Sequence, residues 1–206
     1  SPTSINENLV GTAVGTLSTT DADGSDTHTY TLVSGSGDTD NSSFNISGSN
    51  LQTAASFDFE SQSSYNIRIE TEDSGGLTYE EAITITITDV NEAPIITSDG
   101  GGSTASISYV ENSTSTVTTV TSTDVDASST ATYSISGTDA DDFIIDSSSG
   151  VLTFTSSPNF EVPTDSDTDN EYTVIVTVTD NGSLTDSQTI TITVVDVNEA
   201  PVITSN

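Results

Sequence analysis

The sequence of 206 residues contains no cysteine, tryptophan, methionine or lysine, and Arg68 is its only arginine. The absence of cysteine excludes a disulfide framework. Small secreted domains that lack disulfides commonly use a metal ion as the alternative structural staple. No apolar run approaches the roughly 20 residues that a membrane-spanning helix needs, and no signal peptide is visible. We therefore expect no direct insertion into a membrane.

Basic residues are almost absent, whereas acidic residues are abundant. Asp and Glu together number 32, and the formal net charge is −31. Such a surface repels nucleic acid and anionic membranes, so nucleic acid is not an expected partner. It also repels itself, so a compact fold needs counterions. A chain of low hydrophobicity and high charge is often disordered, but the regular alternation of apolar residues described below favours folded domains.

An internal repeat organises the chain. The hexapeptide Asp-Val-Asn-Glu-Ala-Pro occurs at 89–94 and again at 196–201. A repeat of about 100 residues is long enough to form its own core, which indicates tandem domains rather than a solenoid. We predict one domain at 1–97 and a second at 98–206. Further segments that recur in the same order are Asn6-Glu7-Asn8 with Val110-Glu111-Asn112, Asp21-Ala22-Asp23 with Asp124-Val125-Asp126, Phe57-Asp58-Phe59-Glu60 with Pro158-Asn159-Phe160-Glu161, Tyr65 with Tyr172, and Asp73-Ser74-Gly75 with Asp180-Asn181-Gly182.

Short alternating segments predict an all-β fold. Segments such as 29–33, 65–69 and 83–87 alternate apolar and polar residues and are rich in β-branched and aromatic side chains. Gly, Asp, Asn and Ser separate them, and no stretch has a helical period. About seven short strands in about 100 residues match the size of an immunoglobulin-like β-sandwich. We expect the glycine-rich segment 95–103 to be a mobile loop that joins the two domains.

The same alternation predicts which side chains form the two cores. In the first domain we expect Ile5, Leu17, Tyr30, Leu32, Phe44, Ile46, Leu51, Tyr65, Ile67, Ile69, Ile83, Ile85 and Ile87 to point inward. In the second domain the expected core is Val117, Val120, Tyr133, Ile135, Phe143, Ile145, Leu152, Phe154, Tyr172, Val174, Val176, Val178, Ile190, Ile192 and Val194.

The repeated hexapeptide carries the strongest chemical signal. It places two acids around an amide, immediately before a proline. Clustered carboxylate, amide and carbonyl oxygens are the ligands that Ca²⁺ prefers. Proline keeps the preceding residue extended, so the segment is not a flexible hinge. Solvated acidic loops are the ordinary alternative for paired acids in β-proteins.

Taken together, the recurring motifs resemble the cadherin repeat. NEN, DAD, FDFE, EDSGG and DVNEAP occur in family order in the first repeat, and related motifs follow in the second. The segments GTAVGTLSTTDADG and DDFIIDSSSGVLTF look like bacterial cadherin-like repeats of large secreted surface proteins. The resemblance covers nearly the whole chain and implies two tandem seven-stranded Greek-key β-sandwiches. It also implies a segment of a longer extracellular adhesin or stalk, secreted or at the cell surface, whose partners include neighbouring repeats.

The resemblance implies about three Ca²⁺ ions at the junction of the two domains, bound by residues from both. Seven carboxylates carry a charge that nearly balances three divalent ions, and without metal they repel one another. The implied ligands are Glu7, Asp58, Glu60, Asn91, Glu92, Asp124, Asp126 and Asp180, with the backbone carbonyls of Val90 and Ala93. Glu92 and Ala93 depart from the Asp-Asn of the usual family motif, and Asn159 stands where the first repeat has Asp58.

Weaker calcium sites are also expected outside the junction. Two are incomplete counterparts of it, at Asp21, Asp23 and Asp73, and at Glu111, Glu161, Asn198 and Glu199. A third candidate is the alternating run Asp165, Asp167, Asp169 and Asn170, which resembles the start of an EF-hand loop. Val176 stands where an EF-hand has its glutamate, so a solvated acidic loop remains the alternative. The acids at 38–41 and 139–142 are expected to be surface residues.

No catalytic arrangement is apparent, and we expect the chain not to be an enzyme. His28 is predicted to be an exposed strand residue without a nucleophile beside it, and Arg68 to pair with a neighbouring acid. The second functional hypothesis is a carbohydrate-binding module of a polysaccharide-degrading protein. It would need exposed aromatic rings, for which Tyr79 and Tyr109 are the candidates. Self-association is also conceivable, but the N-terminal tryptophan of the cadherin adhesive mechanism is absent.

Overall fold

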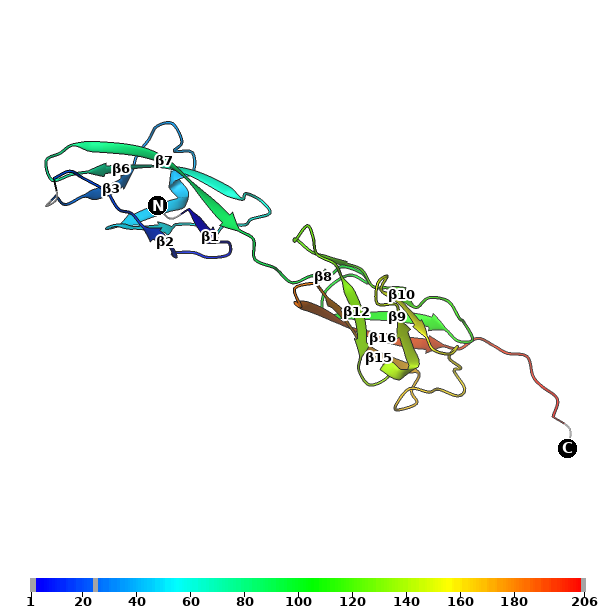
Figure 1. The fold of residues 1–206 in the computed structure, drawn as a ribbon. Coiled ribbons are helices and arrows are strands. Elements are labelled where there is room, and N and C mark those ends of the chain that lie inside the picture. The colour runs from blue at the N-terminus through cyan, green and yellow to red at the C-terminus, as the bar shows by residue number, and fades with distance from the viewer. Residues whose placement is uncertain (1–2, 24–25, 205–206) are drawn as a thin grey trace. The chain divides into compact units, whose positions relative to one another are not determined.

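The structure is a computed structural model, and it describes residues 3–23 and 26–204. The chain divides into two compact units, unit 1 at Ser1–Val90 and unit 2 at Asn91–Asn206. Each unit is built from short strands, with one short 3₁₀ turn described in each (Figure 1). The predicted all-β class is therefore confirmed.

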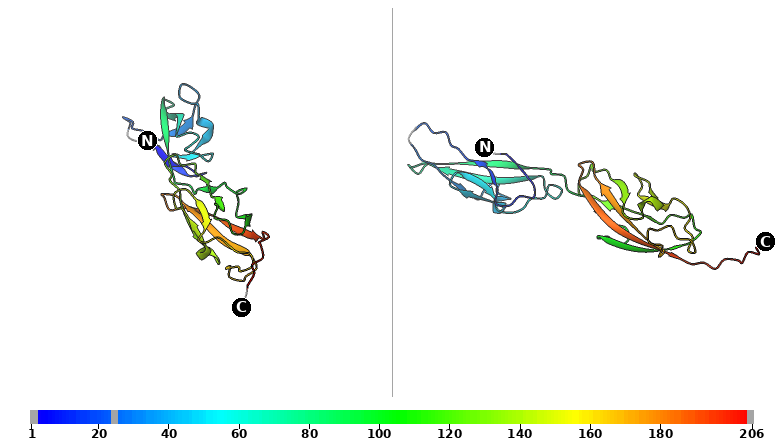
Figure 2. Two further views of the ribbon diagram at one scale, coloured as in Figure 1. Left: turned by 90° about the vertical axis from the view of Figure 1, so that its right-hand side faces the viewer. Right: turned by 90° about the horizontal axis from the view of Figure 1, so that it is seen from below.

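Unit 1 is a two-layered sandwich. One sheet has the order β1 (Ser4–Asn6), β7 (Thr78–Thr88), β6 (Ser64–Glu72) and β3 (Thr29–Leu32), and β1 pairs with β7 in parallel. The other sheet has the order β2 (Ala13–Thr16), β5 (Asn50–Thr53) and β4 (Phe44–Ser47), and the 3₁₀ turn η1 (Asn41–Ser43) precedes β4. The chain passes repeatedly between the two sheets, as the predicted Greek-key sandwich requires. Figure 2 shows the two layers of strands.

Unit 2 repeats this architecture with additional short strands. Its larger sheet has the order β12 (Thr132–Ser136), β15 (Glu171–Thr179), β16 (Thr185–Val195) and β9 (Thr104–Val110), with β9 parallel to β16. A three-stranded sheet contains β10 (Thr118–Thr119), β14 (Val151–Phe154) and β13 (Phe143–Ile145). β11 (Ser122–Thr123) pairs with β8 (Ile95–Ile96), and η2 (Ala140–Asp142) precedes β13.

Alternation along the strands fills both cores. In β15 every second residue from Tyr172 to Val178 is buried, and β16 buries Ile190, Ile192 and Val194 in the same way. In unit 1, Ile67 and Ile69 of β6 are buried in one cluster with Ile85 and Ile87 of β7. Most predicted inward residues are buried or packed against these clusters. The periodicity of two was therefore sufficient to identify the core faces.

Three buried aromatic or apolar residues were missing from the predicted cores. Phe57 packs against Tyr65 in a tilted arrangement, with ring centroids 4.4 Å apart. Tyr109, predicted to be a surface residue, is only 4% exposed and donates a hydrogen bond to the Ser115 carbonyl at 2.7 Å. Ile96 is 1% exposed because its side chain is part of the core cluster of unit 2.

The prediction that 95–103 is a mobile joining loop is wrong. β8 pairs with β11, and the buried amide of Gln188 donates a hydrogen bond to the Gly102 carbonyl at 3.1 Å. These hydrogen bonds fix the segment to unit 2. The compact units accordingly divide after Val90, earlier than the predicted boundary after residue 97.

Candidate metal centres

A buried glutamate lies at the end of unit 1 where β7 ends. Glu7 follows β1 and is 2% exposed. Its Oε2 accepts a hydrogen bond from the Phe59 N–H at 2.8 Å, and its Oε1 accepts one from the Val90 N–H at 2.9 Å. Both oxygens are therefore held in place by backbone donors from segments distant in sequence. The positive φ of Asn8, 61°, turns the chain away immediately afterwards.

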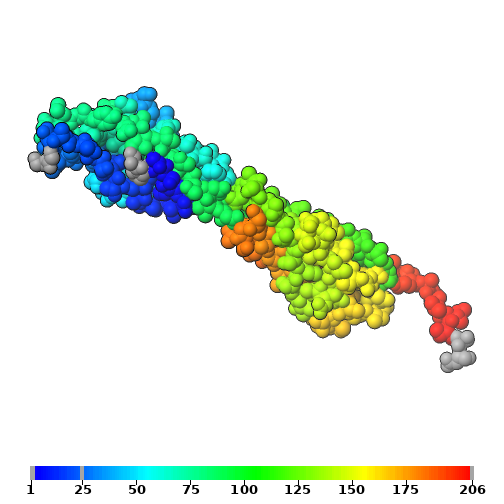
Figure 3. Space-filling view, in the orientation of Figure 1, coloured from blue at the N-terminus to red at the C-terminus, as the bar shows by residue number. Residues whose placement is uncertain are grey.

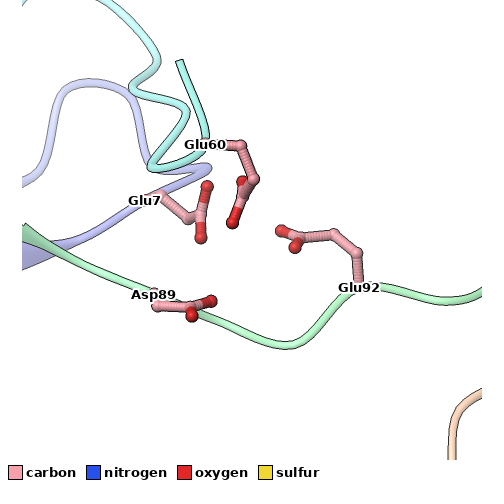
Figure 4. A group of neighbouring side chains, drawn as sticks. All are labelled: Glu7, Glu60, Asp89 and Glu92. Carbon is pink, nitrogen blue, oxygen red and sulfur yellow. The ribbon is translucent and has the colours of Figure 1, made fainter. Parts of the chain in front are cut away.

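Three further carboxylates gather around Glu7. One carboxylate oxygen from each of Glu7, Glu60, Asp89 and Glu92 lies within 4.8 Å of the others. Figure 4 shows the side chains of Glu7 and Glu60 pointing into the same space, with Asp89 and Glu92 on the segment that follows β7. Like charges at this spacing repel by several kcal/mol at an effective dielectric of about 20. A divalent cation with oxygen ligands would turn this repulsion into coordination.

The two basic side chains of the described residues pair with other acids. Arg68, the only arginine of the sequence, forms an ion pair with Glu80 at 2.7 Å, as predicted. His28 lies just before β3 rather than on an exposed strand position, and its Nε2 is 3.3 Å from Asp21 Oδ2. The residues around Glu7 thus fit a bound cation, and Ca²⁺ suits a set made of carboxylates.

Unit 2 repeats the arrangement at its own C-terminal end. Glu111 is 2% exposed and accepts hydrogen bonds from the Phe160 N–H at 2.9 Å and the Val197 N–H at 2.7 Å. These two hydrogen bonds lower the pKa of the Glu111 carboxyl. Glu111 belongs to a group of four acids, in which one carboxylate oxygen from each residue lies within 4.8 Å of the others: Glu111, Glu161, Asp196 and Glu199.

The charges in this second group perturb one another. A backbone hydrogen bond lowers the pKa of Glu161, but desolvation and the charges of Glu111, Glu199 and Asp196 outweigh it, so the pKa is raised. Asn112 also donates its side-chain N–H to Glu199 at 2.8 Å. Ligand-type oxygens are therefore gathered in unit 2 in the same pattern as in unit 1.

A different set of carboxylates lies at the start of unit 2. Asp126 Oδ2 accepts the Glu92 N–H at 2.9 Å, and Asp180 Oδ2 accepts the Asn91 side-chain N–H at 2.7 Å. Asp180 is 5% exposed. Burial raises its pKa, but hydrogen bonds from Asn91 and from the backbone of the following turn outweigh this and lower it. Asp124 accepts the Asp126 N–H at 3.0 Å, which fixes the loop that carries both acids.

The equivalent residues of unit 1 are also close together. One oxygen from each of Asp21, Asp23 and Asp26 lies within 4.8 Å of the others. Asp73 is the counterpart of Asp180, and its Oδ1 accepts the Gly75 and Leu77 N–H groups, both at 2.8 Å. The structure thus adds Asp26 to the predicted acids of this region.

The group around Glu7 includes one acid outside the predicted ligand set and does not include one acid of that set. Asp58 accepts hydrogen bonds from the backbone and hydroxyl of Ser61, at 3.0 and 2.9 Å, which lower its pKa, and it is not in the clustered group. Asp89 takes part in the cluster instead, and Asp196 does so in unit 2. Both open the repeated hexapeptide, so the repeat itself contained the signal. Val90 and Ala93 lie on the same irregular segment as Asn91 and Glu92.

The exposed fractions of Tyr79, Tyr109 and Asp139 test the predictions that these side chains lie on the surface. Tyr79 is 66% exposed, whereas the burial of Tyr109 prevents it from stacking on a sugar. Asp139, predicted to be a surface residue, is 4% exposed, because it accepts backbone hydrogen bonds from two segments. The structure thus leaves one exposed ring of the two that the carbohydrate hypothesis named.

In the part of the chain that the structure describes, none of the helices has the length and apolar character needed to cross a membrane.

Comparison with known proteins identifies the fold and the family. The sequence matches the cadherin domain at residues 1–88 and again at 104–195. The structure is similar to the crystal structure of mouse Cadherin-23 EC22-24, with a TM-score of 0.61 and 24% identity over 96% of this chain and 63% of that chain. It is also similar to Protocadherin Gamma B2 extracellular cadherin domains 1-5, with a TM-score of 0.63 and 23% identity over 96% of this chain and 39% of that chain.

A third similar structure is the ectodomain of human Desmocollin-1, with a TM-score of 0.59 and 24% identity over 95% of this chain and 40% of that chain. The chain spans less than two thirds of the length of each of these three structures. No curated protein sequence matches it. The two matched segments cover most of both units, and the chain therefore belongs to the cadherin domain family.

Proposed function

We propose that this chain is a calcium-stiffened segment of a longer extracellular adhesive or stalk protein. Calcium ions, about three of them, bind at the segment 89–93 through oxygens from both units. The ligands proposed are Glu7, Glu60, Asp89, Asn91, Glu92, Asp124, Asp126 and Asp180, with the carbonyls of Val90 and Ala93; Asp58 completes the set if its hydrogen bonds to Ser61 open.

One observation carries this proposal: carboxylates of each unit hold the segment that joins them. Within unit 1, Glu7 accepts the Val90 N–H. Within unit 2, Asp126 accepts the Glu92 N–H and Asp180 accepts the Asn91 side chain. The joining segment is thus ordered by acids whose own charges remain uncompensated by any basic residue. Cations bound there would stabilise the joining segment in one conformation.

The family supports the adhesive role and the location. Cadherin domains are typically calcium-binding modules of adhesion ectodomains, and the similar structures are ectodomain fragments. Neighbouring repeats of the same kind are the partners that the repeat architecture favours. We assign no catalytic role. The polysaccharide hypothesis loses support because Tyr109 is in the core.

The rigidity of the joining segment is measurable directly, because the sequence lacks cysteine. Exposed Ser36 and Ser148, one in each unit, are replaced by cysteine and spin-labelled. Pulsed electron paramagnetic resonance then gives the distance distribution between the labels. We expect calcium to narrow this distribution and EDTA to broaden it. The same measurement on Asp126→Ala should show a weaker effect of calcium.

An unchanged width in saturating calcium would reject the stiffening role. Labels at two exposed positions within unit 2, such as Ser106 and Ser148, give the matched control, because their distance should not respond to the joining segment.

A further inference from the structure

Unit 2 contains an acidic loop that unit 1 lacks. Five residues separate Phe59 from Tyr65 in unit 1, whereas eleven separate the equivalent Phe160 and Tyr172. The added residues include Asp165, Asp167 and Asp169. Figure 3 shows the yellow-to-gold residues that follow β14 on the surface of unit 2. These three aspartates are separate from the group of Glu111, Glu161, Asp196 and Glu199 and from the acids Asp124, Asp126 and Asp180 at the start of the unit.

The acids of this loop converge instead of spreading into solvent. One carboxylate oxygen from each of Asp165, Asp167 and Asp169 lies within 4.8 Å of the others. Asp167 and Asp169 are exposed, but Asp165 is 3% exposed. Left-handed backbone at Thr168 and Asn170, with φ of 61° and 68°, curls the chain around the three carboxylates. A loop whose only role is solubility has no reason to bury one of its acids.

The buried aspartate is only half satisfied. Asp165 Oδ2 accepts the Asp169 N–H at 2.8 Å, but Oδ1 is buried and accepts no hydrogen bond. The side-chain oxygen of Asn170, the next residue after Asp169, is also buried and lacks a donor. An ionised buried oxygen without a donor is costly unless a cation compensates it. The two unsatisfied oxygens are hard ligands of the kind that Ca²⁺ takes.

The loop is anchored in a way that presents it to a ligand. Asp139, at the start of η2, is 4% exposed and accepts the Ser166 N–H at 2.9 Å through Oδ1 and the Thr173 N–H at 2.7 Å through Oδ2. In unit 1 the equivalent Asp40 likewise accepts the Asn66 N–H at 2.7 Å. The contact with Thr173 is thus common to both units, whereas the contact with Ser166 ties the added loop to the sandwich. Thr164 anchors the same loop through hydrogen bonds to Asp142 Oδ1 at 2.8 Å and to the Tyr172 hydroxyl at 3.1 Å.

The three carboxylates lie close enough together to repel one another. Neither Arg68 nor His28 lies near, since both pair with acids of unit 1. The loop therefore concentrates negative charge without a protein cation to balance it.

We propose that Asp165, Asp167 and Asp169 bind one Ca²⁺ ion inside unit 2, separate from the calcium of the joining segment. Carboxylates at alternate positions can approach one ion, and the Asn170 amide oxygen, loop carbonyls and water fill the remaining positions of a coordination shell that takes six to eight oxygens. Ca²⁺ suits such an irregular loop better than Mg²⁺, which requires near-octahedral geometry. The missing EF-hand glutamate lowers the number of carboxylate ligands without removing the site. The bound ion fixes the loop against β15.

This proposal does not depend on the calcium-stiffened joint, and its test separates the two. The test variant is Asp167→Ala with Asp169→Ser, two exposed positions whose replacement leaves the core intact. The control variant, Asp141→Ala with Asp146→Ser, removes the same charge from exposed positions of unit 2 outside the loop. Hydrogen exchange of the backbone amides is followed at 163–171 and at 86–93, with calcium and with EDTA, together with the number of ions bound.

We expect calcium to slow exchange at 163–171 by roughly tenfold or more in the wild type and in the control variant. In the test variant this protection should vanish and the chain should bind one ion fewer, while 86–93 keeps its response. Either of two results overturns the proposal: exchange at 163–171 that ignores calcium in the wild type, or a test variant that keeps both the protection and the number of bound ions.

Discussion

At the scale of single residues, Glu7 and Glu111 have the same role in the two units. Each is a nearly buried carboxylate whose two oxygens accept backbone N–H groups. One donor lies in the loop before a long strand (β6 or β15), and the other lies in the segment after the following strand (β7 or β16). Two hydrogen bonds fix the position of each carboxylate but do not neutralise its charge. Each glutamate is thus fixed in position at the place where the other acids of its cluster gather.

Replacement of Glu7 tests this role. Glu7→Gln keeps the shape of the side chain but turns an amide NH₂ toward a backbone N–H and removes one charged ligand oxygen. We expect calcium binding at this cluster to weaken by roughly tenfold or more, measured by isothermal titration calorimetry. Glu81→Gln, an exposed change on β7, is the matched control and should leave binding unchanged. Equal binding in both variants would remove Glu7 from the ligand set.

Gly182 is a second residue with a specific requirement. A Cβ at this position would overlap the side-chain amide of Asn91, which donates to Asp180. Gly182→Ala should therefore displace Asn91 and weaken calcium binding by roughly three- to tenfold, because supporting contacts position metal ligands. Gly75→Ala is the equivalent change in unit 1, where the nearest side-chain atom is Asp73 Oδ1 at 3.2 Å. A titration in which the two variants bind calcium equally would contradict this reading.

Acidification should release calcium from the group around Glu111. The pKa of Glu161 is raised in the metal-free protein, so protons occupy this carboxylate at a higher pH than they occupy an ordinary glutamate. Calcium must displace those protons, and its apparent affinity should fall as the pH decreases. Calcium titrations between about pH 7 and pH 5 measure this dependence. Glu161→Gln should flatten it, and an unchanged slope in that variant would contradict the assignment.

In the absence of metal, the Glu111 carboxyl should make unit 2 less stable as the pH falls. Its folded-state pKa is lowered, so its contribution to stability is present above the ordinary glutamate pKa and is lost as the pH falls through the lowered value. The raised pKa of Glu161 means that its ionisation destabilises the fold at neutral pH, and its protonation relieves that cost. The two effects partly cancel on acidification when metal is absent.

At the scale of elements, alternation predicted the long strands well because one face of each sheet is buried. It failed where strands are short or where neighbouring contacts decide burial. β8 has two residues, Ile95 and Ile96, followed by a glycine-rich turn that resembles a linker. Its pairing with β11 depends on residues 25 or more positions away, which no local pattern reports.

Tyr109 shows that some misses were avoidable. The repeat aligns Glu111 with Glu7, and therefore Tyr109 with Ile5, which was correctly placed in the core. An alignment of the two repeats residue by residue would have predicted that Tyr109 is buried. The burial of Asp139 and Asp165, in contrast, depends on loop geometry that the residue pattern does not determine.

The hairpin between β13 and β14 tests how strongly a left-handed backbone position requires glycine. Gly150 has φ of +69°, and a Cβ there would overlap the Val120 carbonyl. Gly150→Ala should lower the free energy of unfolding of unit 2 by more than about 2 kcal/mol, because a left-handed alanine costs roughly 1 kcal/mol before the overlap is relieved. Gly48, at φ +61° in the hairpin between β4 and β5, has open space around it, so Gly48→Ala should cost only about 1 kcal/mol. Chemical denaturation measures both, and equal losses would contradict the role of the Val120 contact.

At the scale of the whole molecule, charge is the dominant constraint. A formal charge of −31 on 206 residues, with one arginine, opposes compaction. The folded units bring acids into groups, which increases the repulsion further. Binding of calcium to the folded state alone stabilises it in proportion to the logarithm of the calcium concentration. We therefore expect the stability of the fold to depend on the calcium concentration.

The sequence alone predicts this dependence on calcium but not the geometry of the acidic groups. The repeat, the acids and the absence of cysteine together predicted calcium as the structural staple. Which acids converge depends on how loops from different strands meet, and the structure groups Asp89 with Glu7, whereas Asp58 accepts hydrogen bonds from Ser61. Local motifs name the candidate ligands, whereas tertiary contacts decide which candidates share an ion.

Thermal unfolding of the whole chain, with calcium chloride or with EDTA, tests the central claim most directly. The account predicts a higher midpoint of unfolding in calcium, and a calcium-dependent increase that is much smaller in Asp126→Ala and in Glu60→Ala. Equal midpoints in calcium and in EDTA for the wild-type chain would contradict it.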